Sequence, residues 1–182
     1  MPRAAAASRY ARRAMGEPDV VIEHPNREKA ASKVTKVVVV LLLLVSAALV
    51  LIVTVGGWAA LEGAKVLQVA FIVVYVVCAG FIMGWKRGLL PVVAALAIVL
   101  GIFAAVSAPA WFDRDKTGLT DPALDADLLG LICAIIVPVQ VLLIAFAMRG
   151  FAQQWNVEVE REVDNDEPEP ARPVRNGEPQ PA

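Results

Sequence analysis

The sequence predicts an all-α membrane protein: an antiparallel four-helix transmembrane bundle with disordered N- and C-terminal tails. Hydrophobic residues make up 58% of the 182-residue chain, with a mean hydropathy of +0.61, whereas roughly 45–50% is typical of soluble domains. Four long runs contain no charged residue, and each is long enough to cross about 30 Å of hydrocarbon as a helix. The charges between these runs are sorted by sign, which predicts the orientation of the bundle.

The uncharged runs define a transmembrane domain of residues 37–148. Its helices are expected at about 37–57, 66–85, 88–110 and 128–148. A short loop, GGWAALEGAK, joins the first two helices, and little more than Lys86 and Arg87 separates the second from the third. So short a turn predicts that the second and third helices are antiparallel neighbours. Pro91 falls in the first turn of the third helix, where its missing N–H does little harm.

The segments on either side of this domain are expected to be disordered. Residues 1–36 form a basic arm with eight Lys and Arg against four acids, and residues 149–182 form an acidic, proline-rich tail with four against eight. Charged, proline-rich segments bury too little apolar surface to fold alone. Residues 149–163 either prolong the fourth helix or form an extended segment, because NVEVEREV alternates with period two.

The distribution of Lys and Arg predicts that both termini lie in the cytoplasm. With the termini inside, the inner segments carry eight, two and four cations, and the outer loops carry only Lys65, Arg114 and Lys116. Cytoplasmic segments retain positive charge during membrane insertion, so the reverse orientation is disfavoured. Tryptophan rings favour the headgroup region, and all four tryptophans fall at or just beyond a predicted helix end: Trp58, Trp85, Trp111 and Trp155.

Small residues spaced four apart predict helix-packing faces on two of the helices. The second helix contains Gly80 and Gly84, and the third contains Ala97, Gly101 and Ala105. Small side chains let helix backbones approach closely in lipid. We expect these faces to pack within the bundle, with a homo-oligomer or partner contact as the alternative.

Gln140 is the most polar side chain deep in the predicted spans, and it follows Pro138 by two residues. A proline inside a helix is expected to kink it. A rise of about 1.5 Å per residue brings Gln140 close in depth to Tyr75 and Cys78, with Ser46 also near the middle of the bilayer. We therefore predict a small polar layer joining the helices, in which each hydrogen bond contributes about 0.6 kcal/mol. A substrate site at the kink is the alternative.

Few residues point to catalysis, a cofactor or a metal, and none of the three is predicted. His24 is the single histidine, and the sequence has no phosphate-binding glycine loop or zinc signature. Cys78 and Cys133 have no CxxC partner and are expected to be buried and inert. The loop segment DRDKTG begins like a calcium loop, but Leu124 stands where such a loop needs a bidentate Glu.

Two segments and the composition carry a resemblance to a group of bacterial proteins. AMRGFAQQWNVEVE, which starts at Ala147, GEPDVV, which starts at Gly16, and the abundance of Ala, Val and Arg resemble the uncharacterised small four-span integral membrane proteins of high-GC actinobacteria. The resemblance covers most of the chain. It implies the bacterial plasma membrane as the location, and it supplies no activity or functional residues to carry over.

These observations favour a non-enzymatic accessory or scaffold subunit of an envelope complex. Its partners would be the lipid bilayer and a membrane protein or a second copy of the chain, with no nucleic acid. The contact residues are expected near the membrane surface, with Trp155 alternatively a simple interface anchor. The candidates are Arg149, Phe151 and Trp155 in the tail and Arg9, Arg12 and Arg13 in the arm.

The alternative function is a small pore or transporter for a neutral solute. Its gate would be the helix break at Pro138 and Gln140. Proton- or ion-coupled transport needs an ionisable group within the membrane, and no predicted span contains a carboxylate.

Overall fold

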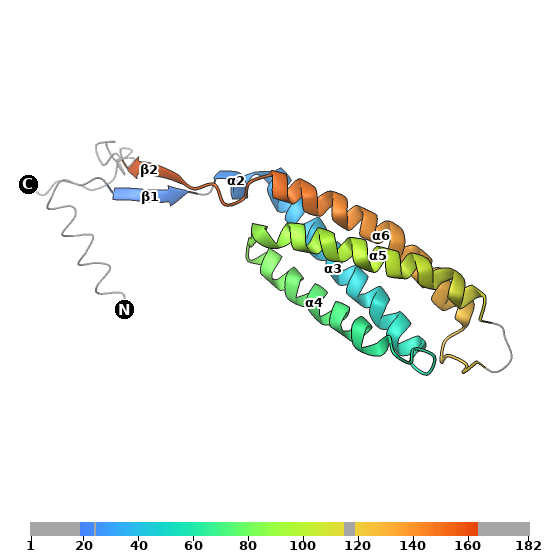
Figure 1. Cartoon of the computed structure of the whole chain (residues 1–182). Coiled ribbons are helices and arrows are strands. Elements are labelled where there is room, and N and C mark those ends of the chain that lie inside the picture. Colours follow the sequence, from blue (N-terminus) through green and yellow to red (C-terminus); the bar gives the residue numbers. More distant parts are fainter. Residues whose placement is uncertain (1–18, 24, 115–118, 164–182) are drawn as a thin grey trace, which may run out of the picture. The chain divides into compact units, whose positions relative to one another are not determined.

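The computed structural model describes residues 19–23, 25–114 and 119–163. Four long helices dominate it, and all four are long and apolar enough to span a membrane. The predicted four-helix transmembrane bundle is confirmed, and the chain is an integral membrane protein. The helices, shown in Figure 1, are α3 (Ala30–Gly56), α4 (Lys65–Met83), α5 (Leu90–Phe112) and α6 (Ala126–Ala152).

The helices differ from the predicted ranges mainly at their ends. A four-residue helix, α2 (Pro25–Glu28), precedes α3, and a short 3-10 helix, η1 (Arg87–Leu89), precedes α5. The helix α3 begins at Ala30 instead of residue 37. The charge-free run marks only the part of a helix that crosses hydrocarbon, whereas lysines in a terminal turn can reach water with their long side chains. The same reasoning explains why α6 extends at both ends beyond the predicted 128–148.

Parts of both tails that were predicted to be disordered are strands. Strand β1 (Asp19–Glu23) pairs antiparallel with β2 (Val159–Val163), with Asp19 opposite Val163. Both contain β-branched residues, which favour strands, but single-sequence patterns do not reveal which distant segment will pair. Residues after α6 are therefore extended in part, as one of the two alternatives predicted. The sheet and the helical bundle are separate units, and residues 1–18 and 164–182 of the predicted tails lie outside the described residues.

The bundle has two distinct ends. We call the end where α3 begins and α6 finishes the terminal end; the turn from α4 to α5 also lies there. The opposite end, with the loop at residues 57–64 and with residues 113–114 and 119–125, is the distal end. Antiparallel α5 and α6 pack along each other, and α3 packs against both α4 and α6, whereas the backbones of α4 and α5 come close at few positions. The prediction that α4 and α5 are antiparallel neighbours is confirmed, since Phe71 and Phe103 meet between them. Their packing is loose, because a short turn constrains only one end of a helix pair.

Small residues make up much of the buried face of α5, and one of them, Gly101, lies against α6. Ala94, Ala97, Ala104 and Ala108 are buried, and a Cβ added at Gly101 would lie 3.5 Å from the Gln140 Cβ. Two of the predicted packing residues, Ala97 and Gly101, thus face the bundle, but Ala105 is exposed. A strict spacing of four drifts by about 40° per step on an α-helix, so alternating steps of three and four are needed to keep one face.

The glycine pair of α4 does not pack within the bundle. Gly80 and Gly84 are both exposed, and a Cβ added at Gly80 would meet nothing within 4 Å. The residues of α4 that face the core include Tyr75, Cys78 and Ala79. The prediction that this pair packs within the bundle is therefore wrong. The helix α4 is rotated so that both glycines face away from the other described helices.

Candidate functional site

Three polar residues from three helices meet near the middle of the bundle. The Tyr75 hydroxyl of α4 donates a hydrogen bond to Gln140 Oε1 of α6 at 3.0 Å, and Gln140 Nε2 donates to Ser46 Oγ of α3 at 2.9 Å. The Ser46 hydroxyl in turn donates to the Leu42 carbonyl at 2.7 Å. Each of the three side chains is at most 1% exposed. We call Ser46, Tyr75 and Gln140 the polar layer. It links α3, α4 and α6 through hydrogen bonds between buried side chains, which are electrostatically stronger than hydrogen bonds in water.

Pro138 lies apart from the polar layer. The helix α6 runs through Pro138 without interruption, and Pro138 is exposed whereas Gln140 is buried. A helix break at these residues, which a substrate site or gate would require, is therefore absent from the described α6. Prolines are tolerated within transmembrane helices because neighbouring groups and local adjustments accommodate the lost hydrogen bond.

Trp155 fills the terminal end of the bundle. The chain reverses after α6 at Gln154, whose φ of 50° is in the left-handed region, and Trp155 is then fully buried. Its ring meets that of Trp85 edge-to-face, with centroids 5.3 Å apart. The predictions that Trp155 contacts a partner or anchors at the membrane interface are both wrong. A tight reversal, which periodicity does not detect, turns the ring into the bundle.

Hydrogen bonds from the beginning of the chain hold the Trp155 segment in place. Arg27 Nε donates to the Trp155 carbonyl at 3.0 Å. The Trp155 indole N–H donates to Gln153 Oε1 at 3.0 Å, and Gln153 Nε2 donates to Thr35 Oγ1 at 3.0 Å. The Lys36 ammonium lies 4.1 Å from the centre of a Trp85 ring, a distance suited to a cation–π interaction. The bonds from Arg27 to Trp155 and from Gln153 to Thr35 join residues more than a hundred positions apart, so sequence patterns do not predict them.

The other predicted contact residues lie at the surface of the terminal end. Arg149 and Phe151 are exposed. Arg87 engages Phe151 twice: its guanidinium lies 4.4 Å from the ring centroid, and its Nε donates to the Phe151 carbonyl at 2.8 Å. Phe151 is therefore held against the α4–α5 turn. Arg9, Arg12 and Arg13 lie outside the described residues.

The acidic distal loop contributes to helix capping. Asp125 accepts hydrogen bonds from the backbone N–H groups of Asp127 at 2.9 Å and Leu128 at 3.3 Å, which makes it the N-cap of α6. The Leu124 N–H donates to the Gly56 carbonyl at 3.1 Å and ties the loop to the end of α3. Within residues 19–23, 25–114 and 119–163, no group of three or more His, Cys, Asp or Glu side chains could hold a metal ion. Asp115 lies outside these ranges.

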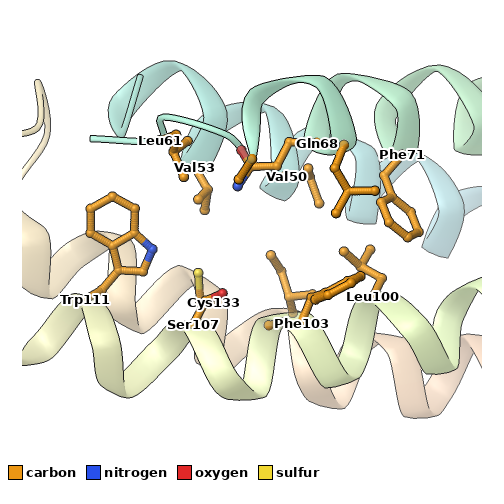
Figure 2. Close-up of a pocket in the computed structure, with 14 residues that line it drawn as sticks. Val50, Val53, Leu61, Gln68, Phe71, Leu100, Phe103, Ser107, Trp111 and Cys133 are labelled. Carbon is orange, nitrogen blue, oxygen red and sulfur yellow. The ribbon is translucent and has the colours of Figure 1, made fainter. Parts of the chain in front are cut away.

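A cavity of about 130 Å³ lies in the distal half of the bundle, and no sequence pattern predicts it. All four helices line it, with Val53 from α3, Gln68 and Phe71 from α4, Phe103 and Trp111 from α5, and Cys133 from α6. Figure 2 shows Trp111 at one end of the cavity and Phe71 at the other. The cavity exists because α5 packs against α6 and leaves α4 without a close partner on that side.

The chemistry available in the described part of the bundle is hydrogen bonding by neutral groups. Its buried hydrogen-bonding side chains are the Gln140 amide, the Trp111 and Trp155 indoles, and five hydroxyl residues: Ser32, Thr35, Ser46, Thr54 and Tyr75. Cys78 and Cys133 are buried free thiols. No family model, no curated protein and no solved structure matches the chain. Its function is therefore inferred from its own residues.

Proposed function

We propose that the protein is a non-enzymatic scaffold or accessory subunit of a complex in the bacterial plasma membrane, and that α4 binds a transmembrane helix of the partner. The observation that carries this proposal is the outward orientation of Gly80 and Gly84. Two glycines one turn apart offer a shallow surface on which a second helix backbone can approach closely. The other helices of the chain do not use that surface, since a Cβ at Gly80 would meet nothing within 4 Å.

The residues around Gly80 and Gly84 support a helix-binding surface. Val76, Val77 and Phe81 are apolar and exposed on α4, so they can pack around a helix seated on the glycines. We call Val76, Val77, Gly80, Phe81 and Gly84 the α4 face. Inside a bilayer the hydrophobic effect does not drive helices together. A partner helix would displace lipid from this surface because it packs against the α4 face more closely than lipid chains do.

The closed centre of the bundle favours this proposal over a pore. Gln140 and Tyr75 are hydrogen-bonded to each other and at most 1% exposed, and Pro138 points outward. Pro138 and Gln140, the residues predicted to form a gate, therefore do not line a common channel. Flux of a neutral solute into proteoliposomes that contain only the purified protein would overturn the scaffold proposal.

Substituting Gly80 with leucine tests the α4 face. Gly80→Leu places a side chain in open space, so we expect the fold to be retained and recovery of the stoichiometric partner to fall about tenfold, which corresponds to about 1.4 kcal/mol. The measurement is a mild-detergent pull-down with quantitative mass spectrometry, together with light scattering to detect a second copy. Ala70→Leu, on the same exposed side of α4 but about 15 Å away from Gly80 along the helix, is the matched control. Equal recovery from Gly80→Leu and the wild type would contradict the proposal.

We further propose that the terminal end faces the cytoplasm, which is supported by the cations at the α4–α5 turn. Glu62 and Lys86 are exposed and lie in loops at opposite ends of the bundle. In intact cells, a membrane-impermeant maleimide should label Glu62→Cys, and Lys86→Cys only after the membrane is permeabilised. The wild type, whose described thiols are both buried, measures the background. The opposite labelling pattern would reverse the assigned orientation.

A further inference from the structure

The distal cavity opens sideways between α4 and α5. Leu67 of α4 and Phe103 of α5 both line the cavity, yet they are 44% and 46% exposed. Side chains that face both the cavity and the surroundings mark its mouth, which lies where the backbones of the two helices come close at few positions. Since both helices span the membrane, this mouth faces the hydrocarbon of the bilayer.

The end of the cavity nearest the polar layer is apolar. Phe71 and Phe103 meet edge-to-face with centroids 6.5 Å apart, and Phe71 also meets the Tyr75 ring at 6.0 Å. These rings separate the cavity from the hydrogen bonds of Gln140. A hydrocarbon chain would therefore contact only apolar surface at this depth.

The other end of the cavity carries hydrogen-bonding groups. Gln68 and Ser107 are half-buried and line it, and Figure 2 shows the Trp111 indole at the same end. Thr54 Oγ1 lies 2.6 Å from the Val50 carbonyl and 2.7 Å from Gln68 Oε1. One hydroxyl proton serves only one of these acceptors, and Gln68 Nε2 donates to no acceptor among the described residues. The Gln68 amide can therefore still donate a hydrogen bond to a ligand.

The size and depth of the cavity match one segment of a lipid chain. Engineered apolar cavities of about 150 Å³ bind benzene, so a cavity of about 130 Å³ admits part of one chain and excludes a helix. Gln68 lies in the first turn of α4, and Ser107 lies in the last two turns of α5. These positions are near the ends of their spans, at the boundary between hydrocarbon and headgroups.

We propose that the cavity between α4 and α5 binds one acyl chain of an ester-linked glycerophospholipid. The chain enters sideways from the bilayer and lies against Phe71 and Phe103. Its ester carbonyl accepts hydrogen bonds from the Gln68 amide and the Ser107 hydroxyl. This site is on the opposite side of the polar layer from Gly80, so it does not depend on the α4 face.

Photocrosslinking of the full chain in phosphatidylcholine vesicles tests the site. The probe is phosphatidylcholine with a diazirine on one acyl chain, and crosslinked residues are identified by mass spectrometry. We expect labelling to concentrate on Phe71 and Phe103. Ala104→Leu, which fills space at a cavity-lining residue, should reduce labelling at least fivefold. Ala105→Leu, at an adjacent exposed residue, should leave it unchanged.

A second variant tests the ester contact without filling the cavity. Gln68→Leu should reduce labelling by the ester-linked probe to the level given by an ether-linked analogue, which lacks the carbonyl. Labelling spread evenly over the outer surfaces of α4 and α5, or equal labelling of the wild type, Ala104→Leu and Gln68→Leu, would overturn the proposal. Loss of labelling when excess oleic acid is added would assign the cavity to a free fatty acid and would overturn the phospholipid assignment.

Discussion

Replacing Trp155 with alanine is expected to lower the free energy of unfolding by about 3–5 kcal/mol, the range for a fully buried aromatic residue. The ring is 0% exposed, stacks edge-to-face on Trp85 and lies beside Gly150, where an added Cβ would come within 3.1 Å of the indole. Its removal leaves a cavity at the terminal end and removes the donor to Gln153. Unfolding in mixed micelles, followed by circular dichroism, measures the loss.

The matched control for Trp155 is the tryptophan at the α3–α4 loop. Trp58 is 51% exposed, so Trp58→Ala should change the free energy of unfolding by no more than about 0.5 kcal/mol. If both substitutions had the same small effect, Trp155 would not close the terminal end as described.

Gln140→Leu is expected to lower the free energy of unfolding by about 1–2 kcal/mol. The substitution removes two interhelical hydrogen bonds, from Tyr75 and to Ser46. Each such bond contributes about 0.6 kcal/mol in a membrane protein, and the Tyr75 hydroxyl is also left buried without its acceptor. The same unfolding measurement applies.

A double-substitution cycle separates the hydrogen bond from packing. Tyr75→Phe should be destabilising in the wild type and should cost nothing further in Gln140→Leu, because the acceptor is already absent. Fully additive effects would mean that the two side chains act independently, contrary to their 3.0 Å contact.

The features that could be predicted from the sequence are those fixed by distance along a helix. Charge-free runs identified all four spans, and the constant rise per residue placed Ser46, Tyr75 and Gln140 at similar depths. The rotation of each helix was harder to predict. All the helices are apolar over most of their circumference, so hydrophobicity does not show which face is inward, and the α4 glycines were assigned to the wrong side.

The features that could not be predicted depend on contacts between distant residues. Trp155 looks like an interface anchor until the reversal at Gln154 and the hydrogen bond from Arg27 are known. The cavity results from the separation of α4 and α5, which the short turn between them does not reveal. The pairing of β1 with β2 also could not be predicted, because neither strand contains a sequence pattern that identifies its partner.

The position of Trp155 also constrains the order of events during biosynthesis. Arg27 and Thr35 leave the ribosome early, whereas Trp155 and Gln153, which they help to hold, follow the last span. The aromatic surface of Trp85 therefore remains without its buried partner until α6 has been made. A chain whose synthesis stops before Trp155 would have some or all of its apolar spans but would leave Trp85 without this contact. Quality-control proteases could recognise such a chain by the exposed aromatic surface at its terminal end.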